Sequence, residues 1–187
     1  MKKFELTAES KINIFGKKLF RIKALISFGD VEEGETGGWI EKEENLEQSS
    51  GDAWVYGDAE VYGNARVYGD AWVYGDARVS GNAEVYGNAR VSGDARVSGN
   101  ARVSGNAEVY GNADYTTIHG FGTQFRTTTF FQCEDKQIRV SCGCFLGTIP
   151  EFREQVKNTR EGKIAEEYLM IADLMEKHFV KEKESGE

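Results

Sequence analysis

The sequence has 187 residues, of which 40% are hydrophobic, and a formal net charge of −8. This length is enough for one elongated unit with closed ends, and the negative charge argues against binding nucleic acid through its phosphates regardless of sequence. No stretch is apolar enough to span a membrane, and no apolar segment follows Met1-Lys2-Lys3 as in a signal peptide. The three cysteines are typical of a reducing compartment, so we expect a cytoplasmic protein.

The N-terminal segment has the pattern of a β-hairpin. Apolar and polar side chains alternate from residue 4 to residue 28, around a turn predicted at Gly16-Lys17-Lys18. A hairpin here would cover the open end of the repeats that follow, where backbone groups would otherwise stay unpaired. Ile40 and Leu46 are already six residues apart, which indicates that irregular coils begin before Gly51.

A six-residue unit is repeated eleven times, without insertion, from Gly51 to about Thr116. Each copy reads Gly, Asp or Asn, Ala, a variable residue, Val, and Tyr or Ser. Because six is even, the alanine and valine of every copy fall on one side of a strand. The Gly-Asp or Gly-Asn step ends each strand, since glycine accepts positive φ. The pattern predicts a solenoid with a Val/Ala core.

The array resembles the hexapeptide-repeat proteins, in which three hexapeptides make one triangular coil of a left-handed parallel β-helix. Gly37-Gly38-Trp39-Ile40-Glu41 and the pattern from Gly143 to Val156 are further similar to a prophage-associated and enterobacterial group of such proteins, often labelled acyltransferases. A coil of 18 residues would stack the variable positions into three outward columns. These are Trp54, Trp72, Arg90 and Glu108; Glu60, Arg78, Arg96 and Asp114; and Arg66, Glu84 and Arg102.

Stacked columns predict contacts between neighbouring coils. Arg90 could lie over Trp72 in a cation–π contact, and Asn64, Asn82 and Asn100 should form an asparagine ladder. A column of aspartates would need local N–H donors or a bound cation; its members are Asp58, Asp76 and Asp94. Opposite charges are expected to pair at Glu60 and Arg78, Arg66 and Glu84, Glu84 and Arg102, Arg90 and Glu108, and Arg96 and Asp114.

After the array, strands are predicted at residues 127–133 and 137–142, joined by a turn at 134–136. Thr148 and Glu151 have the spacing of a capping box at the start of a helix, and a second helix is predicted from about Lys163 to Val180, before a charged tail. The expected fold is mainly β: a left-handed parallel β-helix with an N-terminal β-hairpin cap and a C-terminal α/β module of a β-hairpin and two helices. The expected units are residues 1–36, 37–116 and 117–187.

Acyl transfer, which the resemblance implies, uses a histidine as general base within reach of the acceptor. The array contains no histidine and no extruded loop, which leaves His119 as the candidate base. A non-catalytic protein without a cofactor is therefore the first interpretation, and an acyl-CoA-dependent acyltransferase is the alternative. Zinc held by His119 and the cysteines 133, 142 and 144 is conceivable, but paired Cys-x₂-Cys spacing is missing, so no metal site is predicted.

The junction after the array is suited to an anion such as a phosphate. Its glycines expose backbone N–H groups, its threonines add hydroxyls, and Arg126 adds a guanidinium. The alternative is a cap whose polar groups satisfy one another. The candidate ligand-binding residues are His119, Gly120, Gly122, Thr123, Gln124, Arg126, Thr127, Thr128, Thr129, Cys144 and Phe145.

Aromatic columns in the N-terminal half predict an interface, because monomers seldom expose so many aromatic side chains together. Ladder stacking along the solenoid is the alternative. The candidate interface residues are Trp54, Tyr56, Tyr68, Trp72, Tyr74 and Tyr86.

These patterns lead to a functional hypothesis. We expect a homo-oligomeric (dimeric or trimeric) binding protein of phage type, which inhibits a host defence by sequestering a small anionic, nucleotide-like ligand or by blocking a host protein. The phage role comes from the resemblance. Besides acyl transfer, a self-assembling structural scaffold is a second alternative.

Overall fold

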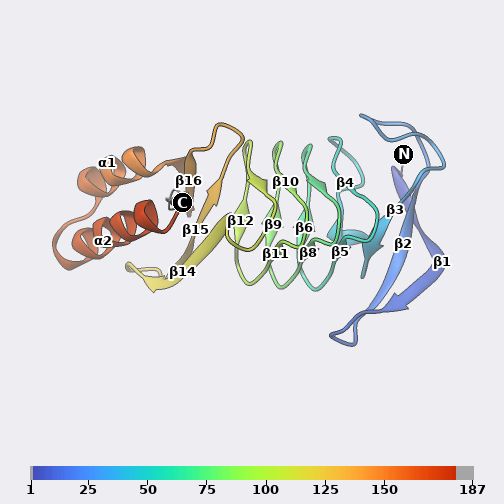
Figure 1. Ribbon diagram of the computed structural model, residues 1–187, viewed down its shortest axis with the longest axis horizontal. Helices are drawn as coiled ribbons and strands as arrows, with labels where there is room; N and C mark the ends of the chain where they lie inside the picture. The colour runs from blue at the N-terminus through green and yellow to red at the C-terminus, as the bar shows by residue number, and fades with distance from the viewer. Residues whose placement is uncertain (1, 180–187) are drawn as a thin grey trace, which may run out of the picture.

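The computed structural model describes residues 2–179; the predicted helix end at Val180 and the charged tail lie outside them. The molecule is elongated, with the N-terminal hairpin at one end, a solenoid in the middle, and a sheet with two helices at the other end (Figure 1). The predicted fold class is confirmed. No helix in the described part of the chain combines the length and the apolar character that crossing a membrane requires.

The repeats form ten two-residue strands, each paired in parallel with the strand 18 residues further along the chain. The backbone follows the same rule, since Trp72 N donates to Ala89 O at 2.9 Å. Three sheets therefore run along the solenoid. The first contains β4 (Trp54–Val55), β7 (Trp72–Val73), β10 (Arg90–Val91) and β13 (Glu108–Val109); the second β5 (Glu60–Val61), β8 (Arg78–Val79) and β11 (Arg96–Val97); and the third β6 (Arg66–Val67), β9 (Glu84–Val85) and β12 (Arg102–Val103).

The alanine and valine side chains of the repeats fill the solenoid interior. From Ala53 to Val109, each of them is at most 1% exposed. Burial of this continuous column of apolar groups supplies the hydrophobic stabilisation that a globular core would otherwise give. The predicted Val/Ala core is confirmed.

An irregular coil precedes the repeats, as expected. Ile40, the last residue of β3 (Thr36–Ile40), pairs with Val61, and Leu46 bridges to Val67 just after the 3₁₀ turn Glu43–Asn45. The offset here is 21 residues (40 to 61, 46 to 67) rather than 18, because three extra residues precede Gly51. Gln48, in this extra segment, accepts a hydrogen bond from Lys3 N at 2.9 Å and so fastens the start of the chain.

The predicted hairpin is formed by β1 (Phe4–Ile12) and β2 (Lys18–Ala24), and it extends the second solenoid sheet. β2 pairs with β3, which pairs with β5, giving the order β1-β2-β3-β5-β8-β11. Phe4 and Phe28 pack edge-on against Trp54, with ring centroids 6.1 and 5.4 Å away. Trp54 is consequently 0% exposed, so its predicted outward position is wrong. The cap that covers the first coil also covers this side chain.

A buried carboxylate attaches the hairpin to the solenoid. Glu60 is 6% exposed and accepts from Asn13 Nδ2 at 3.2 Å. Lys11 Nζ lies 2.9 Å and Arg78 Nε 3.7 Å from its carboxylate oxygens. Because three donors surround the carboxylate, its burial is compensated, and the hairpin turn is fixed to the side of the second sheet.

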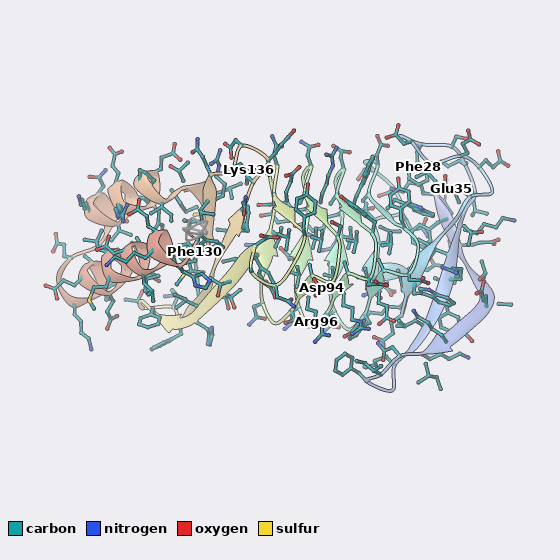
Figure 2. All side chains as sticks on the ribbon, in the orientation of Figure 1. Phe28, Glu35, Asp94, Arg96, Phe130 and Lys136 are labelled. Atoms are coloured by element: carbon teal, nitrogen blue, oxygen red, sulfur yellow. The ribbon has the colours of Figure 1, made fainter. Side chains whose placement is uncertain are left out.

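The C-terminal module is an antiparallel sheet in the order β14 (Tyr115–Phe121), β15 (Arg126–Gln132), β16 (Ile138–Cys142) and β17 (Phe145–Thr148). The helices α1 (Ile149–Thr159) and α2 (Gly162–His178) cover one face of this sheet (Figure 1). Phe130 packs among the helices, and Figure 2 labels it there, whereas the next residue, Phe131, joins the solenoid core. Alternation along β15 therefore closes the last coil and anchors the helices at once.

The sequence predicted β15, β16 and the helices but missed β14 and β17. Glycines made both segments resemble loops: Gly120 sits in a register shift of β14, and Gly147 lies within β17. The predicted capping box is confirmed, because Thr148 N donates to Glu151 Oε2 at 2.7 Å and Glu151 N donates to Thr148 Oγ1 at 3.4 Å.

The predicted contacts between coils form in part. Arg90 lies 5.4 Å from the Trp72 ring centroid, and the asparagine ladder is present. Charge pairs form at Arg78 with Glu60 (3.7 Å) and Arg102 with Glu84 (2.8 Å).

The other three predicted charge pairs are absent from residues 2–179, because nearer partners take the carboxylates. Arg102 holds Glu84, Lys136 lies 3.5 Å from Glu108, and Asp114 accepts from the backbone N–H groups of Tyr110 and Gly111. Figure 2 labels Lys136 near the last coil, and Asp94 and Arg96 on the far side of the solenoid, where both are exposed.

The corner glycines allow a matched test of the coil spacing. Gly81 and Gly99 both have φ of +69°, but a Cβ on Gly81 would lie 2.9 Å from Gly99 N, whereas a Cβ on Gly99 meets nothing within 4 Å. Both alanine variants should incur the left-handed backbone cost of about 1–2 kcal/mol. Gly81→Ala should lower the free energy of unfolding by about 1–3 kcal/mol more, because it forces two coils apart. Urea unfolding of the two variants measures this difference, and equal losses would contradict close stacking at the corner.

Candidate functional site

Two cavities lie on either side of Arg126 in the C-terminal module. The first, of about 880 Å³, is bordered by the two helices, and the second, of about 710 Å³, by the last coils of the solenoid. Both volumes are in the range of small-molecule pockets, roughly 300–1,000 Å³. Arg126, Cys144 and Phe145 line both cavities, so the two form adjoining parts of one site.

The first cavity concentrates positive charge in an acidic protein. Its lining contains Arg126, Lys157 and Arg160 but a single carboxylate, that of Glu161. The whole chain, by contrast, has a net charge of −8. Cations gathered in this way create a positive potential that favours an anionic ligand. Aromatic and amide side chains complete the wall: Phe145, Phe152, Tyr168, Gln124, Gln155 and Asn158.

Arg126 keeps its hydrogen-bond donors available. The side chain is exposed, and among residues 2–179 it has neither a hydrogen-bond partner nor an ion-pair partner. Its guanidinium crosses Gly143, where a Cβ would lie 2.5 Å from Arg126 Nη1. The absence of a side chain at Gly143 therefore gives the guanidinium its place between the cavities, with its donor fork free for a phosphate or carboxylate.

The second cavity lies at the joint between solenoid and module. Tyr86, Asn100 and Arg102 line it from the solenoid, and His119 and Thr127 line it from the hairpin β14–β15. Arg102 is held in place, because its Nε donates to Glu84 Oε2 at 2.8 Å and its Nη1 donates to Gly143 O at 3.3 Å. These bonds tie the loop beneath Arg126 to the solenoid.

The predicted ligand-binding residues separate into those that line the cavities and those that hold the sheet together. Thr128 and Thr129 belong to the second group: both are buried, Thr128 Oγ1 donates to Cys142 Sγ, and Thr129 Oγ1 accepts from Arg102 N. Gly120 and Gly122, with φ of +93° and +70°, shape the end of β14. The predicted residues that line a cavity are His119, Thr123, Gln124, Arg126, Thr127, Cys144 and Phe145.

Sequence reasoning missed the contributions of the helices and the solenoid. Lys157 and Arg160 lie at the C-terminal end of a helix, where basic residues are common for the helix dipole alone. Tyr86 and Asn100 look like any other copy of the repeat. Tyr168 falls on the apolar face of α2, and burial, together with neighbouring Cys142, raises its pKa. Only the folded chain brings these residues to one place.

The cysteines and His119 do not form a metal site. Among residues 2–179, no group of three or more His, Cys, Asp or Glu side chains is placed to hold a metal ion. Cys133 is buried, and this burial raises the pKa of its thiol to about 11. Cys144, by contrast, is exposed beside Arg126. His119 Nδ1 lies 3.3 Å from Thr127 Oγ1 on the neighbouring strand.

The six aromatic residues predicted as an interface do not share one surface. Trp54 is buried, and Tyr56 packs edge-on against Trp72 beside the first sheet, with ring centroids 5.6 Å apart. Tyr68 and Tyr86 follow strands of the third sheet, where their rings stack. Tyr74 is half-buried at the corner after β7. Aromatic contacts along the solenoid thus account for much of their packing, and the homo-oligomer stays a prediction.

The tyrosine beside Glu84 gives a test in alkaline solution. Burial raises the pKa of Tyr68 to about 12, and the nearby Glu84 carboxylate adds to the shift. An unfolded tyrosine ionises near pH 10, so the stabilisation linked to Tyr68 is complete below pH 10 and is lost as the pH rises through 12. The free energy of unfolding of Tyr68→Phe should therefore fall less steeply than that of the wild type over this range.

Urea unfolding at several pH values measures the slope. Glu84→Gln is the companion variant: the pKa of Tyr68, followed by phenolate absorbance, should fall but stay above 10, since burial is its larger cause. Identical slopes for the wild type and Tyr68→Phe would contradict the assignment.

The comparisons with known proteins bear on the solenoid. A family model described as the YdcK beta solenoid repeat matches three segments of the array, residues 59–75, 83–99 and 95–111. No curated protein matches the chain. The matched segments lie between β5 and β13 and include neither the hairpin cap nor the C-terminal module. The array is thus similar to a known β-solenoid repeat, which agrees with the parallel coils of the structure.

Proposed function

We propose that this protein is a non-catalytic binding protein that takes a small anionic ligand at its C-terminal module. The observation that carries the proposal is the free guanidinium of Arg126 between two adjoining cavities. Lys157 and Arg160 strengthen the positive potential on the helix side, and Gly143 leaves room for the arginine. In this interpretation the solenoid is a rigid support that holds one wall of the site.

Binding has more support than catalysis. A catalytic base usually depends on a neighbouring group that orients it. His119 has its one hydrogen-bond contact among the described residues with a threonine hydroxyl, and no carboxylate orients the ring. Acyl transfer, the alternative from the sequence, therefore has less support. Sequestration of the ligand to inhibit a host defence, and a homo-oligomeric state, stay predictions from the sequence.

Replacing Arg126 tests the proposal. Arg126→Gln removes the charge while keeping a polar side chain, and it should weaken binding of inorganic pyrophosphate about tenfold or more, since a charge-assisted hydrogen bond contributes about 1.5–3 kcal/mol. Isothermal titration calorimetry at fixed salt concentration measures the dissociation constants.

The matched control is Arg153→Gln in α1. Arg153 is paired with Asp173 at 2.7 Å and Glu176 at 2.6 Å and lines neither cavity. This variant should bind pyrophosphate like the wild type. A wild type that binds no pyrophosphate, or an Arg126→Gln variant with unchanged affinity, would overturn the proposal.

A further inference from the structure

A ladder of tyrosine rings ends at the second cavity. The rings of Tyr68 and Tyr86 are stacked, with centroids 4.9 Å apart and planes inclined by 2°. The residue 18 positions further is Ser104, whose small side chain cannot continue the stack. Tyr86 is therefore the last ring, and it lines the cavity. Since Tyr68 covers one face of the Tyr86 ring, the part of Tyr86 that borders the cavity is its other face and its edge.

The asparagine ladder ends at the same cavity. Asn64 Nδ2 donates to Asn82 Oδ1 at 3.2 Å, and Asn82 Nδ2 donates to Asn100 Oδ1 at 3.0 Å. Each amide thus gives its N–H to the next coil. The residue 18 positions after Asn100 is Ile118, in β14, which offers no amide. Asn100 lines the cavity, and its Nδ2 has no acceptor among residues 2–179.

The remaining lining suits a flat heterocycle with an attached phosphate. Phe125 and Phe145 provide apolar walls, and Thr127 and Ser141 provide hydroxyls. Arg126 stands where this cavity adjoins the first one. A planar ring with hydrogen-bonding edges could extend the tyrosine stack while its edge accepts from the asparagine. Aromatic side chains stack on nucleobases in this way, because every base has a π-face.

We infer that the ligand is a nucleoside phosphate, whose base stacks on Tyr86 and accepts a hydrogen bond from Asn100 Nδ2, and whose phosphate binds Arg126. This inference rests on the proposed function, because it assigns the phosphate to the same arginine. It adds a base subsite formed by the solenoid. The tyrosine and asparagine ladders are then more than structural stacks, since their last members are the recognition groups.

Comparison of two probes that differ only in the base tests the subsite. AMP should bind the wild type about tenfold or more tightly than ribose 5-phosphate, as measured by isothermal titration calorimetry. Tyr86→Ser should reduce AMP affinity to that for ribose 5-phosphate and leave the latter unchanged. Serine already occupies this repeat position in five other copies, including Ser80 and Ser92, so the coil should tolerate it. Tyr86→Phe, which keeps the ring, should bind AMP like the wild type.

Tyr74→Ser is the matched control, because the same replacement is made at another corner that lines neither cavity. It should leave the affinities for both probes unchanged. If AMP binds no more tightly than ribose 5-phosphate while Arg126→Gln still weakens both, the base subsite is overturned and the anion site stands. If neither probe binds the wild type, the inference and the proposed function both fail.

Discussion

The vertical register of the backbone is the constraint on which the structure depends. Each coil donates its N–H groups to carbonyl groups about 18 residues further along, so every side chain has a counterpart directly above it. This arrangement buries valine on valine and aligns the ring of Tyr68 with that of Tyr86. A glycine at each corner permits the turn. Loss of the period at Tyr115 accordingly ends the core, the ladders and the solenoid together.

The two ends of the solenoid are closed in different ways. At the N-terminal end, β2 and β3 continue the second sheet, and Glu60 draws donors from the hairpin to the coil. At the C-terminal end, β15 lies across the last coil: Phe131 enters the core, Gln132 N donates to Asp114 O at 2.8 Å, and Glu134 N donates to Asn106 O at 3.1 Å. The second closure also produces the site, because the sheet that covers the core presents Arg126 at its margin.

The sequence predicted best where local pattern and tertiary packing agree. The repeats, the capping box and the hairpin each depend on spacing within a short segment, and all three are confirmed. Trp54 was wrong because its position in the repeat is outward, while Phe4 and Phe28, far away in the sequence, cover it. β14 and β17 were missed because their glycines suggested loops.

The candidate site was predictable only in part. Arg126 and its neighbours stand in one polar segment, which drew attention to them. Lys157 and Arg160 reach the same cavity through the packing of α1 on the sheet, and Tyr86 differs from other repeat tyrosines only in the coil it occupies. Five of the eleven predicted ligand residues line the first cavity. The buried threonines do not, because β15 turns alternate side chains into the sheet interior.

The closed ends also limit how large an assembly this chain can build. A bare coil presents a row of unpaired backbone groups, and an identical coil on another molecule would match it, so uncapped solenoids could polymerise end to end without limit. Here the Phe4 and Phe131 caps occupy both templates. Growth along the axis is therefore stopped within each molecule, and contact between copies is directed to the lateral faces.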